Sequence, residues 1–300
     1  MTGSIICVGH AALDRIYRIE AFPARPTKVR ALEHVESGGG MAANAAATIG
    51  TLDGQVELWS RVGADDAANR IRSALKQAKV DIRYVETFDE GRTSTSAIIV
   101  DDQGERLIVG TRDPNMPSGT SWLPVERIGN AAIVLADLRW LEAVRAVFAR
   151  ARASNVPTVL DADVGNRDAL TDILALTDYA VFSEEALADY LPDLDQQARL
   201  DRIMLLGPRH AGVTLGSGGY VWRDTFGGGQ VRAFDVDVVD TTGAGDAFHG
   251  AFALALAEQQ PIADCARFAS AVAAMKCTRL GSRAGLPKRK DVEAFLASNP

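Results

Sequence analysis

Short apolar runs alternate with longer amphipathic stretches along most of this 300-residue chain. The runs have the length of buried strands, and the apolar residues of the stretches recur near the helical period. The expected strands are Ser4–Gly9, Val56–Trp59, Ile133–Asp137, Thr158–Asp161, Tyr179–Phe182 and Ile203–Leu206. The expected helices are Met41–Ile49, Asp65–Lys79 and Leu141–Ala153. This alternation predicts an α/β fold, a doubly wound parallel sheet covered by helices on both faces.

Two regions interrupt the alternation and predict a second, smaller sheet. Residues 15–35 have the character of extended chain, and the runs Ser94–Val100 and Glu105–Thr111 flank a polar turn as in a β-hairpin. A small sheet with one apolar face needs cover, either from closure over a substrate or from the matching sheet of a second copy. The expected division is a lid of residues 14–35 and 93–112 and an α/β body of residues 1–13, 36–92 and 113–300.

Composition limits the class of protein. The net charge of −7 argues against a nucleic-acid binder, which attracts phosphates with excess positive charge. Cys7, Cys265 and Cys277 are widely spaced and predict reduced core thiols instead of a disulfide or zinc site. No apolar run reaches the roughly 18 residues of a membrane helix, and the N-terminus lacks a secretory pattern. We therefore expect a cytoplasmic enzyme without nucleic-acid or membrane partners.

The segment 236–248 carries the most specific chemical signal. Its β-branched start, Val236–Val239, predicts a strand, and Phe248–Ala257 predicts a helix, so the residues between them form a tight turn whose backbone N–H groups face an anion. A carboxylate at Asp246 repels phosphate, which favours a base that accepts a proton from an attacking hydroxyl. The alternative is that Asp246 only caps the helix. The residues of the turn are Gly243, Ala244 and Gly245.

Two further groups of residues have the character of ligand sites. A strand that ends at Thr214 runs into a glycine cluster, where exposed backbone can lie against a nucleotide, although a glycine-rich hairpin explains the pattern equally well. Near the N-terminus, Asp14 and Asn44 flank the glycines 38–40, and their side chains suit sugar hydroxyls. Spacing alone favours a simple helix-start turn for the second group.

Together, and in this order, these groups resemble the ribokinase-like (PfkB) family of sugar kinases. The resemblance covers nearly the whole chain and implies a doubly wound α/β domain with a β-sheet lid, which often serves as the dimer clasp. It implies ATP-dependent phosphorylation of a sugar hydroxyl with Mg²⁺, Asp246 as the base, and Gly243, Ala244 and Gly245 as the anion hole. The implied sugar-binding residues are Asp14, Gly39, Gly40 and Asn44. The implied ATP-binding residues are Ser183, Thr214, Gly216, Ser217, Gly219 and Gly245, and a monovalent cation such as K⁺ is implied at Asp240, Thr242 and Gly281.

One motif departs from the family pattern. Many members carry Asn-x-x-Glu after a central strand, linked to the magnesium water shell, where this chain has Ser183-Glu184-Glu185-Ala186. Glu184 is the residue that can substitute in part as a metal ligand. This departure is the only support for a sensor that binds sugar and nucleotide without turnover, and the intact Asp246 argues against that function.

Within the family, the strings Val134–Trp140, Ala180–Glu184 and Lys276–Arg279 resemble the sulfofructose kinases. That resemblance implies phosphorylation of the 1-hydroxyl of 6-deoxy-6-sulfofructose, an anionic ketohexose. Lys28 and Arg139 match two of three sulfonate ligands, while the third, an asparagine, is Gly110 here, near Arg112. Local positive charge in an acidic chain suits an anionic substrate. A neutral sugar or nucleoside, such as fructose or ribose, and fructose 6-phosphate stay as alternatives.

Overall fold

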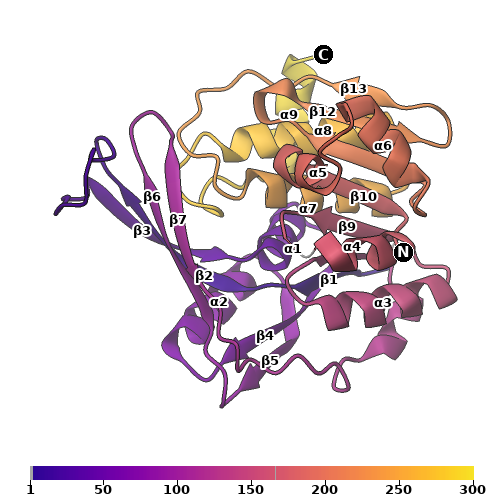
Figure 1. The fold of residues 1–300 in the computed structure, drawn as a ribbon, viewed down its shortest axis with the longest axis horizontal. Coiled ribbons are helices and arrows are strands. Elements are labelled where there is room, and N and C mark those ends of the chain that lie inside the picture. Colours follow the sequence, from indigo (N-terminus) through magenta and orange to yellow (C-terminus); the bar gives the residue numbers. More distant parts are fainter. Residues whose placement is uncertain (1–2, 166) are drawn as a thin grey trace.

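The computed structural model describes residues 3–165 and 167–300, which form two sheets (Figure 1). The large sheet has nine strands, parallel from β11 to β5 and antiparallel at the other edge. Its strands lie in the order β13 (Gly229–Val231), β12 (Tyr220–Asp224), β11 (His210–Thr214), β10 (Tyr179–Ser183), β9 (Thr158–Ala162), β8 (Ile133–Asp137), β1 (Ile5–Gly9), β4 (Val56–Gly63) and β5 (Asp81–Phe88). The small sheet has the order β3 (Glu33–Gly39), β2 (Ala12–Arg18), β6 (Ser94–Val100) and β7 (Arg106–Thr111).

Helices cover both faces of the large sheet, because its central strands are apolar on both sides. Ile5 and Cys7 of β1 belong to one buried cluster, and Ile6 and Val8 belong to another. The first cluster includes residues of α1 (Met41–Thr51), α2 (Asp66–Gln77), α7 (Ala244–Ala257), α8 (Ile262–Lys276) and α9 (Arg289–Ser298). The second includes residues of α3 (Leu141–Ala153), α4 (Arg167–Leu174), α5 (Glu184–Tyr190), α6 (Gln196–Met204) and the short helix η1 (Val125–Asn130). The expected fold class is confirmed.

The strand expected at Ile203–Leu206 is wrong. These residues form the end of α6 and the turn after it. Asp195 caps this helix by accepting a hydrogen bond from the Ala198 N–H at 2.9 Å, and Leu200 and Ile203 bury one helical face three residues apart. The neighbouring strand comes later, as β11. The polar cap and the helical spacing outweigh the short apolar run.

The strand expected at Val236–Val239 is also wrong. This segment is not part of either sheet, and Val238 and Val239 are exposed. The N–H groups of Val239 and Asp240 both donate to the Cys277 carbonyl oxygen, at 2.8 and 3.1 Å, so the segment lies along the end of α8. The following helix, α7, begins at Ala244 and not at Phe248, which places Asp246 inside its first turn.

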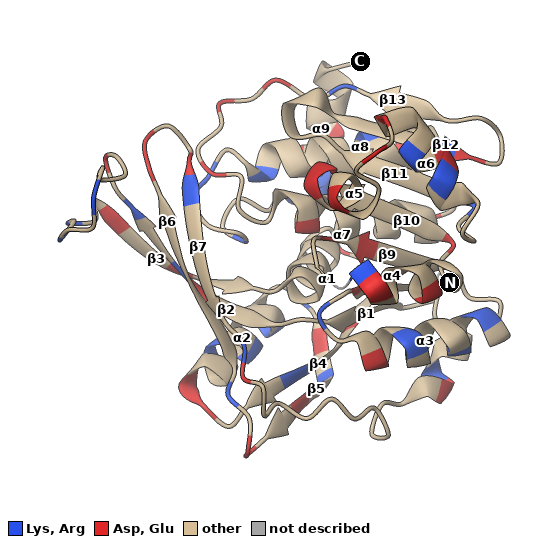
Figure 2. Ribbon diagram, viewed as in Figure 1, with Lys and Arg blue, Asp and Glu red and all other residues tan. Residues whose placement is uncertain are grey.

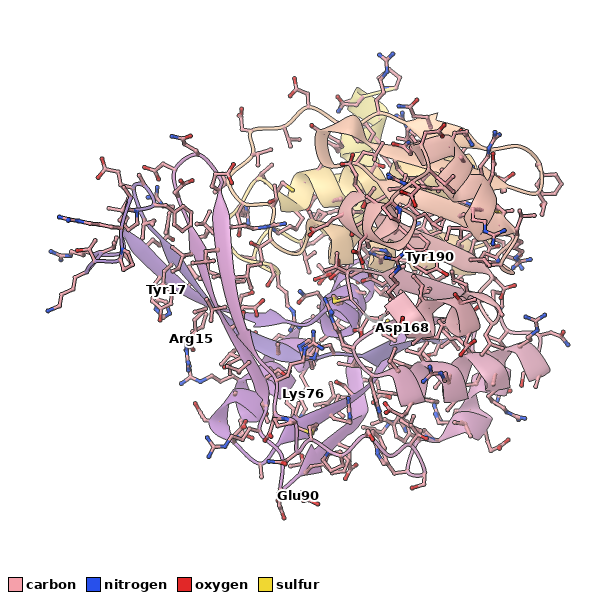
Figure 3. All side chains as sticks on the ribbon, viewed as in Figure 1. Arg15, Tyr17, Lys76, Glu90, Asp168 and Tyr190 are labelled. Atoms are coloured by element: carbon pink, nitrogen blue, oxygen red, sulfur yellow. The ribbon has the colours of Figure 1, made fainter. Side chains whose placement is uncertain are left out.

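The small sheet presents alternate residues to the body and away from it. Figure 3 shows Arg15 and Tyr17 of β2 on the outer side of the small sheet. Side chains alternate along a strand, so Asp14, the residue before Arg15, faces the body. On the inner side, Ile16, Ile98 and Val100 form a small buried cluster against Leu280. The lid boundaries predicted from the sequence stay a prediction, because β2 and β3 continue into the body at Ala12 and Gly39.

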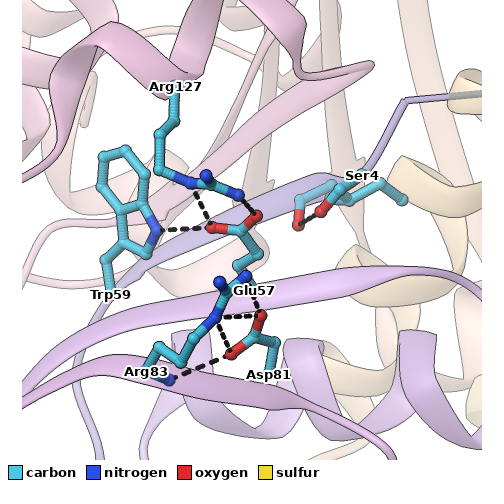
Figure 4. A network of polar contacts seen from close by, with 7 residues as sticks. Ser4, Glu57, Trp59, Asp81, Arg83 and Arg127 are labelled. Carbon is cyan, nitrogen blue, oxygen red and sulfur yellow. Dashed lines mark hydrogen bonds and ion pairs between the residues drawn. The ribbon is translucent and has the colours of Figure 1, made fainter.

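A polar network joins η1 to the start of β4 (Figure 4). The buried Glu57 carboxylate pairs with the Arg127 guanidinium and accepts a hydrogen bond from Trp59 Nε1 at 3.3 Å. Asp81 and Arg83 form a second ion pair on the neighbouring strand, at 2.6 Å. Burial of one carboxylate with its partner fixes the position of η1 against the sheet. Within residues 3–165 and 167–300, the helices are too short or too polar to cross a membrane.

Candidate active site

The first turn of α7 lies beside the carboxyl ends of the central strands. Gly243, the residue before the helix, has a left-handed backbone (φ 77°), and a Cβ there would overlap Ser282. The N–H groups of Gly245 and Asp246 have no partner within the helix, as in any first turn, and the space in front of Gly245 is open. Backbone donors and the helix dipole suit this turn to an anion, so its role as an anion site stays a prediction, and the cap is Gly243, not the Asp246 side chain.

Asp246 is partly buried and held by one amide. Asn44 Nδ2 donates to Asp246 Oδ2 at 2.7 Å, while Oδ1 has no hydrogen-bond partner among residues 3–165 and 167–300. Burial, and after it repulsion from Asp161, raise the pKa of Asp246 to about 7, against the opposing effect of the Asn44 hydrogen bond. A carboxylate with a pKa near neutrality is matched to the task of a general base.

Asp14 lies on the inner side of the small sheet, next to the same group. It is 8% exposed, and Ser96 Oγ donates to its Oδ1 at 2.6 Å. Burial raises the pKa of Asp14. A Cβ at Gly39 would overlap the Asp14 carboxylate, and Gly40 has a positive φ of 86° where α1 begins. The glycines therefore let β3 and α1 bring Asn44 close to Asp14.

Arg283, which sequence reasoning did not assign to the site, joins these residues. Its Nε donates to Asn44 Oδ1 at 2.7 Å, and its Nη2 donates to the Gly39 carbonyl at 3.3 Å. Burial lowers its pKa to about 10, while the charges of Asp14 and Asp246 oppose that shift. Arg283 thus orients the Asn44 amide so that its NH₂ group faces Asp246. In the sequence, Arg283 follows Lys276–Arg279 in a string that resembles the sulfofructose kinases, but that resemblance assigned it no role.

His249 contacts the glycine turn, and Asp161 contacts His249. His249 Nδ1 lies 2.7 Å from the Gly245 carbonyl oxygen, an acceptor, so Nδ1 carries a hydrogen. His249 Nε2 lies 3.4 Å from Asp161 Oδ1 on β9. Burial raises the pKa of Asp161 well above its usual range and lowers that of His249. Sequence reasoning missed both, since neither stands in a recognisable spacing.

A cavity of about 480 Å³ joins the glycine turn to the predicted nucleotide loop. Phe248 and Cys277 contribute to its wall. Ser183 does not line it; its Oγ instead caps α5 by accepting from the Ala186 N–H at 3.2 Å. The predicted site residues that line the cavity are Thr214, Gly216, Ser217, Gly219, Ala244 and Gly245.

The small sheet also reaches the glycine turn. Arg106, the first residue of β7, donates from Nη1 to Thr241 Oγ1 at 3.0 Å. This contact spans the two sheets and places a cation beside the cavity. Sequence reasoning did not identify Arg106, because only the fold brings the β6–β7 hairpin over the turn.

The predicted metal residues fall in two places. Glu184 is exposed at the start of α5, where Figure 2 shows a concentration of acidic residues. Asp240 is buried, and Thr242 and Gly281 each donate a backbone N–H to its carboxylate at 2.8 Å. In the described part of the chain, no three His, Cys, Asp or Glu side chains group as a metal site.

A cluster of cations surrounds Asp137 at the end of β8. The buried Asp137 carboxylate accepts from the backbone N–H groups of His10, Ala42 and Arg139 at 2.8 to 3.0 Å. The Arg139 guanidinium pairs with Asp163 at 2.7 Å. Partial burial lowers the pKa of Arg112, and the nearby charge of Arg139 lowers it further.

Arg112 differs from its neighbours in having no ion pair or hydrogen bond among the described residues. Burial, together with the charges of Arg112, Arg139 and Arg61, lowers the pKa of His10 to about 4, against the opposing charge of Asp137. The imidazole is therefore neutral at neutral pH. Arg61 lies over the Trp140 ring at 4.2 Å. Three arginines thus gather at one end of the site, of which sequence reasoning found two.

The remaining predicted substrate residues lie on the small sheet. Gly110 is exposed on its inner side, opposite Ser96, and a Cβ there would meet open space. Lys28 is exposed in the loop between β2 and β3, which Figure 1 shows at the end of the small sheet away from the body. The fold of one chain therefore does not bring Lys28 to Arg139.

Comparison with known proteins identifies the family. The model of the pfkB family of carbohydrate kinases matches residues 2–289. The chain belongs to this family. The kinase is 30% identical over 295 residues to the ATP-dependent ribose-1-phosphate kinase of Halopiger xanaduensis, with 98% of each chain covered. The expectation of a sugar kinase is confirmed.

Solved structures give the same fold. The ribokinase of Arabidopsis thaliana, solved with ribose and ATP, is 27% identical and superposes with a TM-score of 0.87 over 99% of each chain. A crystal structure from Agrobacterium tumefaciens is 32% identical, with a TM-score of 0.94 over 99% of this kinase and 98% of that chain. The narrower resemblance to sulfofructose kinases stays a prediction.

Proposed function

We propose that this kinase transfers the terminal phosphate of ATP to a hydroxyl of a sugar that carries an anionic group at its far end. The observation that carries the substrate class is Arg112, a cation that forms no ion pair within the described part of the chain and lies near the charge of Arg139. Arg139 is already paired with Asp163, whereas Asp137 and Asp163 act on Arg112 only through their charge and form no ion pair with it, so a phosphate or sulfonate supplies the direct partner of Arg112. The relative named as a ribose-1-phosphate kinase acts, by its name, on a sugar of this class.

The reaction centres on Asp246. The sugar lies between Asp14 and Asn44, and its reacting hydroxyl donates to Asp246 Oδ1, because Oδ2 accepts from Asn44 at 2.7 Å. The hydroxyl oxygen attacks the terminal phosphorus, the bond from that phosphorus to the bridging oxygen breaks, and the proton moves to Asp246 Oδ1. The free N–H groups of Gly245 and Asp246 bind oxygens of the transferring phosphoryl group.

The nucleotide occupies the 480 Å³ cavity in this proposal. Its base and ribose lie along the glycines after Thr214, and its phosphates extend to Ala244 and Gly245, since the same cavity touches both ends. Arg106 is poised over the phosphates through its contact with Thr241.

The carboxylates at the ends of β9 and β10 fit Mg²⁺. This ion needs only one or two carboxylates when phosphate oxygens and waters complete its shell. Asp163 Oδ1 lies 3.4 Å from Ser183 Oγ, and Glu184 follows Ser183 directly, so Asp163 and Glu184 are the residues that would offer such oxygens, although Asp163 Oδ2 is also paired with Arg139. Mg²⁺ held there would neutralise charge on the phosphates.

A substrate panel tests the proposal. We expect ribose 1-phosphate, fructose 6-phosphate or 6-deoxy-6-sulfofructose to exceed ribose and fructose in kcat/KM. The 1-hydroxyl of the sulfonated ketohexose and the far hydroxyl of the sugar phosphate are alternative acceptors. Arg112→Ala should raise KM for the anionic sugar about 10- to 100-fold, which corresponds to the free energy of one charged hydrogen bond. The KM for ribose should not change. Arg145→Ala, an exposed arginine on α3, is the matched control. Equal kcat/KM for neutral and anionic sugars would refute the anion site.

The outer side of the small sheet supports a homodimer in this proposal. Leu107 and Val109 of β7 are 50% and 56% exposed there, and a second copy of the sheet would cover them. Light scattering checks the mass in solution. Val109→Asp should convert a dimer to a monomer, and a wild-type monomer at micromolar concentration would exclude this assembly.

A further inference from the structure

Lys276, the last residue of α8, is fully buried. Its Nζ donates to the main-chain oxygen of Asp240 at 2.7 Å and lies 4.0 Å from Asp240 Oδ2. A buried ammonium loses its hydration, so such a lysine persists only where a specific partner compensates for the loss. The partner here is a single residue, three positions before Gly243.

Asp240 connects the two loops that form the floor of the glycine turn. Its Oδ1 accepts from the Thr242 N–H and its Oδ2 from the Gly281 N–H, both at 2.8 Å. In the other direction, the Asp240 N–H donates to the Cys277 carbonyl at 3.1 Å. The loop before the turn and the loop after α8 are therefore fastened at one carboxylate, and Lys276 provides the positive charge that balances it.

The family resemblance implies a monovalent cation at Asp240, Thr242 and Gly281, and these residues do not fit one. Thr242 and Gly281 direct N–H groups, not oxygens, at the Asp240 carboxylate. The main-chain oxygen of Asp240 already accepts from the Lys276 ammonium. A metal cation against Oδ2 would also face that ammonium at close range, in a buried region where like charges repel strongly.

We propose that the Lys276 ammonium takes the place of the monovalent cation and makes phosphoryl transfer by this kinase independent of K⁺. Lys276 is a positioning residue: it acts through Asp240 on the backbone of the glycine turn and does not touch the substrates. The inference rests on the proposed role of that turn as the anion site. The fixed charge also adds positive potential near the place where negative charge gathers in the reaction.

The wild-type kinase tests this directly. ADP release is measured with ribose and with ribose 1-phosphate, with Mg-ATP, in KCl, NaCl or tetramethylammonium chloride at one ionic strength. We expect rates within about twofold across the three salts. Activation of tenfold or more by K⁺ would overturn the inference. Absence of sugar-dependent ADP release in every salt would instead refute the proposed function. This result differs from activation by K⁺, so the two failures can be told apart.

Thermal unfolding gives a readout that does not depend on turnover. The midpoint of the wild-type protein should be the same in KCl and in tetramethylammonium chloride, because no site for K⁺ is open. A rise of several degrees specific to K⁺ would overturn the inference even if no sugar were found.

Two variants test whether the Lys276 ammonium is the reason that turnover does not need K⁺. Lys276→Met keeps the length of the side chain without its charge, and we expect kcat to fall about 10- to 100-fold while both KM values change little. Lys276→Ala leaves space, so K⁺ or ethylammonium should restore part of the rate or raise the unfolding midpoint. Lys288→Met, an exposed lysine before α9, is the control. Unchanged kcat in Lys276→Met, or no response of Lys276→Ala to either cation, would contradict the assignment.

Discussion

Replacing Asp246 by asparagine should stabilise the folded kinase while it abolishes turnover. The asparagine oxygen can still accept the Asn44 hydrogen bond, so the geometry is retained and only the charge is lost. In its proposed role as general base, Asp246 would contribute about 10²- to 10⁴-fold to the rate, so kcat should fall by that factor. The stability effect follows from the raised pKa of the carboxyl group.

The size of the change in the free energy of unfolding follows from the difference between the pKa of Asp246 in the folded and in the unfolded state. Asp246 has a pKa of about 7 when folded, against a usual value of 3.8. Between these two values the folded state holds more protons than the unfolded state, so the free energy of unfolding decreases as pH rises and the loss is complete above pH 7. Three pKa units correspond to about 4 kcal/mol, which partial solvent contact reduces to about 2–4 kcal/mol.

Urea unfolding of the wild type and Asp246→Asn at pH 5 and pH 8.5 measures this effect. The variant should be the more stable at both values, and the gap should grow by about 2 kcal/mol from pH 5 to pH 8.5. Asp237→Asn, which changes an exposed aspartate nearby, should show no such trend. A gap that does not change with pH would refute the raised pKa. Wild-type kcat in Asp246→Asn would refute the catalytic role.

Three other changes have defined outcomes. Asn44→Leu removes a hydrogen bond that lowers the pKa of Asp246, so the acid limb of the kcat/KM profile should move to higher pH; a limb at the wild-type pH would contradict this. Gly243→Ala forces a side chain into a left-handed backbone against Ser282 and should lower the free energy of unfolding, measured in urea, by about 1–3 kcal/mol. Arg106→Ala should raise KM for ATP in steady-state kinetics, because the cation over the cavity is lost; an unchanged KM would leave Arg106 with a role at the small sheet only.

The body of the fold was predictable because local signals there agree with the tertiary structure. Strands β1, β8, β9 and β10 are buried on both faces and therefore read as continuous apolar runs. The two strand predictions that were wrong, at Ile203–Leu206 and Val236–Val239, concern short apolar or alternating runs. The conformation of such runs depends on residues outside them. Ile203–Leu206 belongs to the end of a capped helix and the turn after it. In Val236–Val239, the Val239 N–H donates to the Cys277 carbonyl instead of to a neighbouring strand.

Residue type and spacing predicted the site where its chemistry stands in one short stretch, whereas Asp14 and Asn44 were named through the family resemblance. The glycine turn and Asp246 are contiguous, so spacing and residue type pointed to them. Arg283, Asp137 and His249 come from three separate parts of the chain, and each acquires its role through contacts that no local pattern reveals. Their assignment to sugar and phosphate stays a prediction, as do the roles of Lys28 and Glu184.

The place of β1 in the large sheet has a consequence for biosynthesis. This strand contains the first described secondary structure of the chain, yet it lies between β4 and β8. Its β8 partner leaves the ribosome roughly 75 residues after β4, about 4–15 s later at 5–20 residues per second. During that interval an apolar strand edge is open, so we expect slow elongation before residue 133 to favour aggregation of the nascent kinase and chaperones to oppose it.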